Sequence, residues 1–135
     1  MYLAARSENL TVLQKNYKKK IILIDRFIDS TIAYQHYGLK VDIKLINILN
    51  NYLLKNFKID FTFLNIVNNS NMIKRLKSRK SLNRYDKFNS RFYKNVQNGF
   101  LKLSKKNKKK YKIIDSNLDI NDNKSLIIKT IDKLI

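Results

Sequence analysis

The sequence predicts an α/β fold built on a doubly wound parallel sheet. Residues 21–24 form an unbroken apolar run, and residues 61–66 and 111–114 are rich in β-branched and aromatic side chains. Such runs are typical of strands, and a non-alternating run fits a strand buried on both faces. Segments with apolar residues at helical spacing lie between them, and alternation of strands with helices favours a parallel sheet. No Pro/Gly linker or internal repeat divides the chain, which indicates one domain over residues 1–135.

The helices are predicted from apolar stripes and from residues that commonly cap helix ends. In the segment after Gly38, for example, Val41, Leu45 and Ile48 recur at helical spacing. Ser and Thr are favoured at the first position of a helix, where their oxygens accept a backbone hydrogen bond. The expected helices cover residues 2–16, a short segment from Ser30 to Gln35, 41–55, a segment that begins at Ser70, 87–104 and 121–135.

The charge of the chain has two explanations that stay open. There are 29 Lys and Arg against 10 Asp and Glu, a net charge of +19, which is typical of proteins that bind phosphate backbones. Yet 23 Lys, 18 Asn and 18 Ile belong to residue types with A/T-rich codons, so composition alone explains much of the lysine. Arg, whose planar fork suits phosphates, occurs only six times.

Several classes of protein are disfavoured by what the sequence lacks. It has no Cys and therefore no disulfide framework, which fits a cytoplasmic protein in a reducing compartment. No apolar stretch approaches the ~20 residues that a membrane helix needs. The only histidine, His36, has no Ser-His-Asp or Cys-His arrangement around it and is expected to be a surface residue.

The pair Asp25 and Arg26 follows the predicted strand at residues 21–24. Ligands bind at the carboxyl ends of parallel strands, so a site is expected there. A carboxylate beside a guanidinium suits phosphoryl transfer, because one can hold magnesium and the other can neutralise phosphate charge. A purely structural ion pair is the alternative.

The segment that begins with this pair carries a family resemblance. Residues 25–35, DRFIDSTIAYQ, resemble the D-R-[YFH]-x-x-S-x-x-A-Y-Q segment of bacterial thymidylate kinases. Four further segments resemble that family in its order: MYLAAR its apolar-apolar-Ala-Ala-Arg helix, IDFTFLNI a strand, IKRLKSRKSLNRYD the arginine-rich lid, and YKIIDSN the last strand. The resemblance implies an enzyme with the P-loop NTPase fold of nucleoside monophosphate kinases, which phosphorylates dTMP to dTDP with ATP for dTTP biosynthesis.

The resemblance also assigns roles in binding dTMP. Arg26 and Asp25 are the expected catalytic residues, with Arg26 between the two phosphates and Asp25 on Mg²⁺ or its water shell. Tyr2 takes the place of the aromatic that stacks on thymine, and Arg6 that of the arginine that holds the dTMP phosphate. The remaining expected dTMP contacts, from the sugar to the base edge, are Ser30, Thr31, Tyr34 and Gln35.

The lid is expected over residues 72–86, with four cations that would act on the ATP phosphates: Arg75, Lys77, Arg79 and Arg84. We expected Arg75, Lys77 and Arg79 to share one helix. ATP and Mg²⁺ are the implied cofactors. The implied partners are dTMP and ATP, together with a second copy of the chain, because enzymes of this family are typically homodimers; no membrane is implied, and nucleic acid is not an expected partner.

Some features depart from the family pattern. An arginine expected near Leu39 is absent, and Asn65 replaces the strand aspartate. No G-x-x-x-x-G-K-[ST] sequence occurs, and the only glycines are Gly38 and Gly99. We therefore expect an incomplete domain, a C-terminal portion with about three strands, without the central strand and its phosphate loop. The chain alone is expected to be inactive and prone to aggregation, because strands that lack a partner expose backbone groups and apolar faces.

Two alternatives to a kinase remain. A small nucleic-acid-binding module would use the +19 charge, with the lysine-rich residues 105–110 as its strongest candidate. A degenerate kinase-like protein would bind nucleotide without chemistry.

Overall fold

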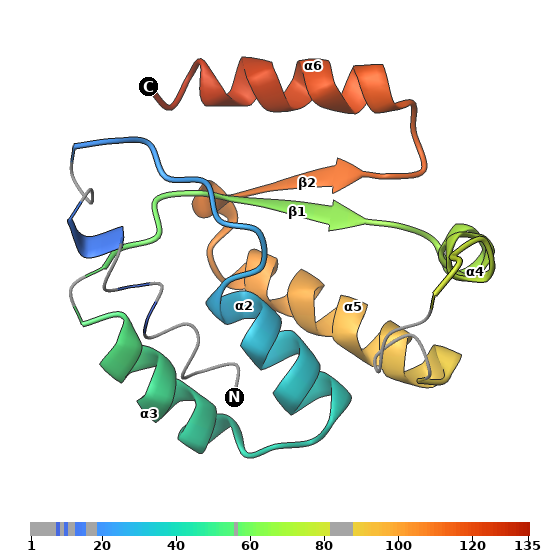
Figure 1. The fold of residues 1–135 in the computed structure, drawn as a ribbon, viewed down its shortest axis with the longest axis horizontal. Coiled ribbons are helices and arrows are strands. Elements are labelled where there is room, and N and C mark those ends of the chain that lie inside the picture. Colours follow the sequence, from blue (N-terminus) through green and yellow to red (C-terminus); the bar gives the residue numbers. More distant parts are fainter. Residues whose placement is uncertain (1–7, 9, 11–12, 16–18, 56, 82–87) are drawn as a thin grey trace. The chain divides into compact units, whose positions relative to one another are not determined.

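The computed structural model describes residues 8, 10, 13–15, 19–55, 57–81 and 88–135. By their backbone contacts the residues fall into two compact units, 1–60 and 61–135, which are taken one at a time. Figure 1 labels the elements of both. The predicted helix over residues 2–16 lies largely outside the described residues.

The first unit is helical. The short helix α2 (Ile28–Thr31) runs directly into a π-helix, η1 (Ile32–Gly38), and α3 (Ile43–Leu53) follows. The Asp42 side chain begins α3 by accepting a 2.8 Å hydrogen bond from the Lys44 backbone N–H, which satisfies one of the free donors at the helix start. The buried hydrophobic residues described in this unit are Leu10, Ala33 in η1 and Ile46 in α3.

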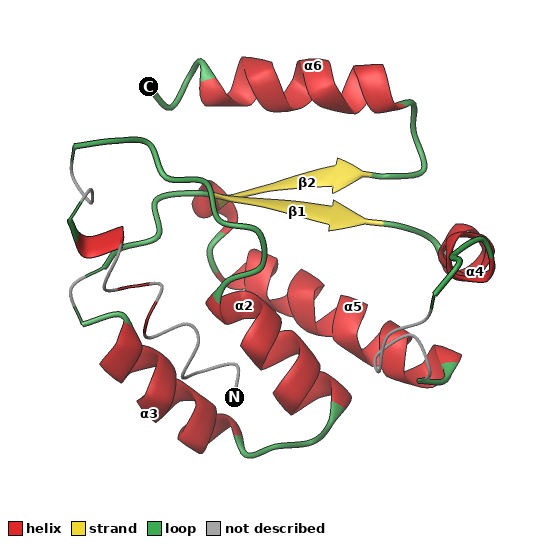
Figure 2. Ribbon diagram, in the orientation of Figure 1, coloured by secondary structure: helices red, strands yellow, loops and turns green. Residues whose placement is uncertain are grey.

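The strand expected at residues 21–24 is absent, so the described residues hold two strands instead of about three. The segment has no ladder partner among the described residues and is drawn as a loop in Figure 2. Leu23 is 82% exposed and Ile21 68%. An apolar run expresses only a preference for burial, whereas a strand also requires a neighbouring backbone to pair with.

The second unit contains a two-stranded parallel sheet. Strands β1 (Thr62–Ile66) and β2 (Tyr111–Asp115) pair in register from Thr62 opposite Tyr111 to Ile66 opposite Asp115. Their carboxyl ends therefore lie side by side. This confirms the strands predicted at residues 61–66 and 111–114 and the parallel α/β architecture.

Helices α5 (Ser90–Lys106) and α6 (Ile120–Ile131) lie on opposite sides of the strand pair, and α4 (Asn69–Lys77) lies beyond the carboxyl end of β1 (Figure 1). A 3₁₀ turn, η3 (Lys108–Lys110), connects α5 to β2. The predicted helices thus agree with the observed ones to within a few residues, except that Asn68, not Ser70, caps α4.

The buried core of the second unit is made of residues from α5 and from both strands. Phe92 and Val96 of α5 are buried, as are Leu64 of β1 and Ile114 of β2. Leu64 pairs with Ile113 and Ile114 pairs with Asn65, so Leu64 and Ile114 point to opposite faces of the sheet. This packing fixes the carboxyl ends of both strands, where ligands bind in parallel sheets.

Candidate active site

Arg26, the central residue of the expected dTMP site, has a strained backbone. Its φ is 56°, in the left-handed region that non-glycine residues rarely adopt. It lies two residues after the apolar segment at residues 21–24 and two residues before the first residue of α2. Such outliers cost about 1–3 kcal/mol and cluster at ligand sites, where a side chain has to be aimed in one direction.

The Arg26 side chain is held against Tyr34, another predicted dTMP residue. An Nη2 N–H of Arg26 donates to the Tyr34 hydroxyl at 3.1 Å, and the guanidinium carbon lies 5.1 Å from the centre of the Tyr34 ring. A cation over an aromatic face within about 6 Å is attracted to the ring. Because Arg26 is otherwise exposed, its remaining N–H groups stay available for a phosphate.

The turn from α2 into η1 carries the other expected dTMP contacts. Ser30 and Thr31 lie in α2, while Tyr34 and Gln35 lie in η1, and all four are half-buried. The π-helix was not predicted; π turns recur at functional sites because their wider spacing redirects side chains. The sequence thus brings four of the predicted residues onto one continuous segment.

The end of the π-helix is tied down by several hydrogen bonds. The backbone N–H groups of Leu39 and Val41 donate to the carbonyls of Tyr34 and Gln35 at 3.0 and 2.9 Å. The Nδ1 atom of His36 lies 3.0 Å from the Val41 carbonyl, and the His36 side chain is half-buried. This contact stabilises the backbone at the bend. The position of Tyr34 and Gln35 is therefore set by the local backbone.

Asp25 suits the role expected for it toward Mg²⁺. Its carboxylate is exposed and has no hydrogen bond or ion pair with any described residue. Magnesium keeps several waters and is commonly held by one or two carboxylates together with phosphates. Among the described residues no group of three or more His, Cys, Asp or Glu could form an all-protein metal site. One free carboxylate next to an exposed arginine fits a metal brought in with a nucleotide.

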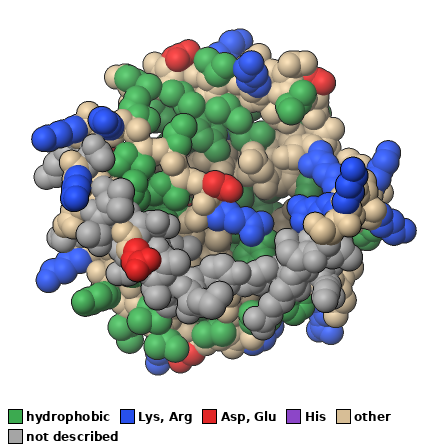
Figure 3. All heavy atoms as spheres, in the orientation of Figure 1, with side chains coloured by type: hydrophobic (Ala, Val, Ile, Leu, Met, Phe, Trp, Pro, Cys, Tyr) green, Lys and Arg blue, Asp and Glu red, His purple; other side chains and the backbone are tan. Residues whose placement is uncertain are grey.

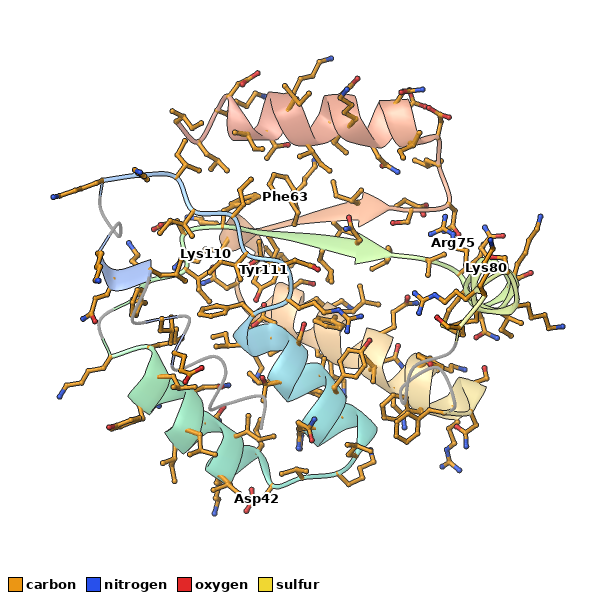
Figure 4. The ribbon with its side chains drawn as sticks, in the orientation of Figure 1. Asp42, Phe63, Arg75, Lys80, Lys110 and Tyr111 are labelled. Atoms are coloured by element: carbon orange, nitrogen blue, oxygen red, sulfur yellow. The ribbon has the colours of Figure 1, made fainter. Side chains whose placement is uncertain are left out.

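The lid residues lie in the second unit, and Figure 3 shows Lys and Arg side chains gathered around α4. Arg75, on α4, donates a 2.7 Å hydrogen bond from Nη2 to the carbonyl of Ser116, just after β2 (Figure 4). Lys77 is exposed at the last position of α4. The prediction that one helix holds Arg75, Lys77 and Arg79 is wrong, because Ser78 ends α4 and its hydroxyl donates to the Arg75 carbonyl.

An asparagine network at the carboxyl ends of β1 and β2 was missed by the sequence. The Asn117 Oδ1 atom accepts from the Asn68 backbone N–H at 3.1 Å and from Asn71 Nδ2 at 3.0 Å. The Asp115 carboxylate in turn accepts from the Asn117 backbone N–H at 2.9 Å. These bonds fasten the start of α4 to the loop after β2. The signal available in the sequence was that asparagines follow both strands, at Asn68, Asn69 and Asn117.

Three predicted residues, Tyr2, Arg6 and Arg84, lie outside the described residues. The acceptor residues 25–35 belong to the first unit, and the lid with its asparagine network belongs to the second. The helices of the described part of the chain include none that is both long and apolar enough to cross a membrane.

The described residues thus form an α/β protein in which Arg26, in a strained turn, is followed by the helix that carries Tyr34 and Gln35. The comparisons with known proteins make the class specific. The family model described as "Thymidylate kinase" matches residues 1–127. The chain therefore belongs to the thymidylate kinase family.

Individual relatives agree with that assignment. The chain is 37% identical over 135 residues to "Thymidylate kinase" of Mycoplasma capricolum, covering 97% of this chain and 63% of the relative. It is 38% identical over 109 residues to "Thymidylate kinase" of Trichodesmium erythraeum, covering 79% of this chain and 48% of that one. The crystal structure of thymidylate kinase from Ehrlichia chaffeensis superposes with a TM-score of 0.71 at 32% identity, covering 96% of this chain and 60% of that chain. The chain thus spans about half to two thirds of the length of these relatives.

Proposed function

We propose that this chain carries the dTMP site and the lid of a thymidylate kinase, which transfers the γ-phosphoryl group of ATP to the 5′-phosphate of dTMP. The observation that supports this most is the geometry of Arg26. Its backbone is left-handed, and its exposed guanidinium is held in one position by the contact with Tyr34. Phosphoryl transfer needs positioned positive charge more than covalent chemistry, because charge is spread over the transferring oxygens.

In this proposal each residue of the acceptor segment has one task. Arg26 binds the dTMP phosphate with the N–H groups that Tyr34 leaves free, and a guanidinium fork suits two phosphate oxygens. Tyr34 packs beneath the sugar, where a 2′-hydroxyl would meet its ring. Gln35 and Thr31 bond the thymine edge, and Ser30 completes this segment of the site.

Two further dTMP contacts and the metal belong to the same proposal. Tyr2 would stack on the thymine ring and Arg6 would hold the phosphate from the other side. Asp25 would hold Mg²⁺, directly or through water, and the metal when bound would screen the phosphate charges. A magnesium titration of the wild-type chain with dTMP present, repeated for Asp25→Asn, tests this by the change in dTMP affinity.

The lid residues Arg75, Lys77, Arg79 and Arg84 would close on the phosphates of ATP. Arg75 is engaged with the Ser116 carbonyl at 2.7 Å, so its action on a phosphate would require it to exchange a backbone partner for an anionic one. A charged acceptor makes the stronger hydrogen bond, which favours this exchange when ATP is present.

Calorimetric titration of the 135-residue chain with dTMP tests the proposal. Wild type should bind, and Arg26→Ala should weaken binding by roughly 10- to 100-fold, because a hydrogen bond to a charged group contributes about 1.5–3 kcal/mol. Arg91→Ala is the matched control, since Arg91 is an exposed arginine of α5 outside the acceptor segment. Equal effects of the two substitutions, or no dTMP binding by wild type, would count against the proposal.

Turnover is a separate question from binding. The 135 residues contain no G-x-x-x-x-G-K-[ST] loop to hold the ATP phosphates, so we expect no dTDP from this chain with ATP and Mg²⁺. Formation of dTDP by the purified chain, followed by ³¹P NMR, would overturn that expectation. Binding of dTMP without turnover would also be the behaviour of a degenerate kinase-like protein.

We further propose that the chain works in the cytoplasm as a homodimer. Leu45, Ile48 and Tyr52 of α3 are 52%, 66% and 78% exposed and fall on one face of that helix, opposite the buried Ile46. An exposed apolar stripe of this kind is typical of an association surface. Light scattering after gel filtration should show a dimer, and Ile48→Lys should convert it to a monomer while Lys44→Gln should not.

A further inference from the structure

The positive charge of the second unit is concentrated in one stretch of the chain. Residues 87–114 contain ten Lys and Arg and no Asp or Glu, so about a fifth of the chain holds ten of its 19 net charges. Lysine enrichment from codon composition would spread charge evenly, with the acidic residues interspersed. The charge of this stretch therefore calls for a physical explanation of its own.

The structure places these charges along one surface, which we call the basic ridge: Arg91, Lys94, Lys102, Lys105, Lys106, Lys108 and Lys109, all exposed. The five ridge residues on α5 fall within an arc of about 120° of the helix at 100° per residue, and Phe92 and Val96 lie on the buried face. From Arg91 to Lys105 the face is about 21 Å long at 1.5 Å per residue.

Six of the seven ridge charges have no side-chain partner among the described residues. Arg91, Lys94, Lys105, Lys106, Lys108 and Lys109 make no ion pair or hydrogen bond through their side chains with any described residue. Cations near the carboxyl end of a helix are stabilised by the helix dipole, but this effect falls off within one turn. The dipole of α5 therefore accounts only for the cations in its last turn. The amino-terminal part of the ridge has no such structural role.

The carboxyl-terminal end of the ridge, residues 105–109, is distant from the lid, whereas the Arg91 end begins beside α4, where the Ser90 hydroxyl donates to Asn69 Oδ1 at 3.0 Å. The last lysines of the ridge precede the amino end of β2, whereas Arg75 and Asn117 lie at the carboxyl ends of the strands. The length of β2, about 13 Å at 3.3 Å per residue, separates the two edges. Figure 4 shows Lys110 at one end of the strands and Arg75 at the other. The lysines at residues 105–109 therefore do not serve the phosphates of the nucleotide that the lid would cover.

We propose that the basic ridge binds the phosphodiester backbone of a nucleic acid. Its length matches about six nucleotide steps of a duplex strand at 3.4 Å per step. The sequence alone did not favour a nucleic acid partner, since the total charge has a compositional explanation. What supports this partner is the placement of seven exposed cations on one surface, six of them without a side-chain partner among the described residues.

The chemistry of the ridge favours this ligand over a membrane or a protein. Among the described residues from 88 to 112, none is an exposed large hydrophobic residue. A helix that binds a lipid surface inserts an exposed apolar face, and protein interfaces rely on buried aromatic anchors. Without exposed aromatic rings to stack on bases, binding should depend on phosphates and not on sequence.

Fluorescence anisotropy with a labelled 20-base-pair DNA, and with an RNA duplex of the same length, tests the proposal. If about five phosphates are contacted, the logarithm of the DNA association constant should fall with the logarithm of salt concentration with a slope of roughly −4.5, at about 0.9 per contact. Absence of binding to both duplexes at 50 mM salt would overturn the proposal.

Two matched triple substitutions distinguish the effect of the ridge on duplex binding from the effect of net charge. Lys94, Lys105 and Lys109 changed to Gln remove three ridge charges, and Lys124, Lys129 and Lys133 changed to Gln remove three from the α6 segment, where Asp122 and Asp132 are interspersed. The ridge triple should flatten the salt slope by about 2.7, and the α6 triple should leave it nearly unchanged. Equal flattening by the two triples would show binding by net charge alone and overturn the proposal.

Vesicles that contain phosphatidylserine give the remaining comparison. The proposal predicts much weaker association with these vesicles than with the duplexes at equal salt. If the ridge triple instead abolishes tight vesicle binding and leaves duplex binding unchanged, the ridge is a membrane surface and the proposal is wrong.

Discussion

The side chain of Asn50 gives the sharpest stability prediction. It lies in α3, four residues after the buried Ile46, and is only 4% exposed. Both its Nδ2 and its Oδ1 atoms are buried without a hydrogen-bond partner among the described residues. Leaving a buried polar group unsatisfied costs about 1–3 kcal/mol, so replacing it with an apolar side chain should be favourable.

Asn50→Leu should therefore raise the free energy of unfolding by about 1–3 kcal/mol. Asn51→Leu is the control, because Asn51 is the exposed neighbour on the same helix and gains the same helix propensity, at most about 0.5 kcal/mol. Urea unfolding followed by circular dichroism measures both; with a slope of about 1–3 kcal/mol per molar, the midpoint of Asn50→Leu should rise by up to about 1 M more than that of the control. A fall in stability, or equal shifts for both variants, would show that Asn50 has a partner and refute the reasoning.

Two more substitutions test the local geometry. Asn117→Ala should speed amide hydrogen exchange in α4 by roughly 10-fold, because it removes the acceptor for Asn68 and Asn71; Asn121→Ala should not, and equal exchange in both variants would rule out a role for the network. Lys40 has a φ of 65°, so Lys40→Gly should stabilise the chain by about 1 kcal/mol, whereas Lys44→Gly inside α3 should destabilise it by a similar amount. Thermal unfolding of the two variants in the same direction would contradict the strain assigned to Lys40.

The sequence predicted the regular elements well where periodicity decides the structure. The apolar stripe of α5 and the apolar segments of β1 and β2 indicate which side chains are buried. The residue ranges of these elements could therefore be predicted from the sequence alone. The strand predicted at residues 21–24 was wrong, because a strand needs a neighbouring strand to pair with and the described residues supply none. Hydrogen bonding between backbones far apart in sequence is not encoded in local composition.

The geometry of the candidate site could not be predicted from the sequence, and its residues stay a prediction from the resemblance. The resemblance selected Arg26 and Tyr34, yet their hydrogen bond depends on the left-handed backbone at Arg26 and on the π-helix that carries Tyr34. Neither feature has a marker in a single sequence, because lysine and arginine carry no intrinsic preference for positive φ. Asn117 was missed for a similar reason, since its partners lie 46 and 49 residues away.

The central claim, that Arg26 binds the phosphate of dTMP, is tested most directly by a thermodynamic cycle. The affinities of the wild-type chain and of Arg26→Ala are measured by calorimetry for dTMP and for thymidine, which lacks the phosphate. Arg26→Ala should weaken dTMP binding by roughly 10- to 100-fold and leave thymidine binding within about two-fold, because only dTMP carries the anion that the guanidinium meets. Equal losses for both ligands would show that Arg26 supports the fold of the site and does not contact the phosphate.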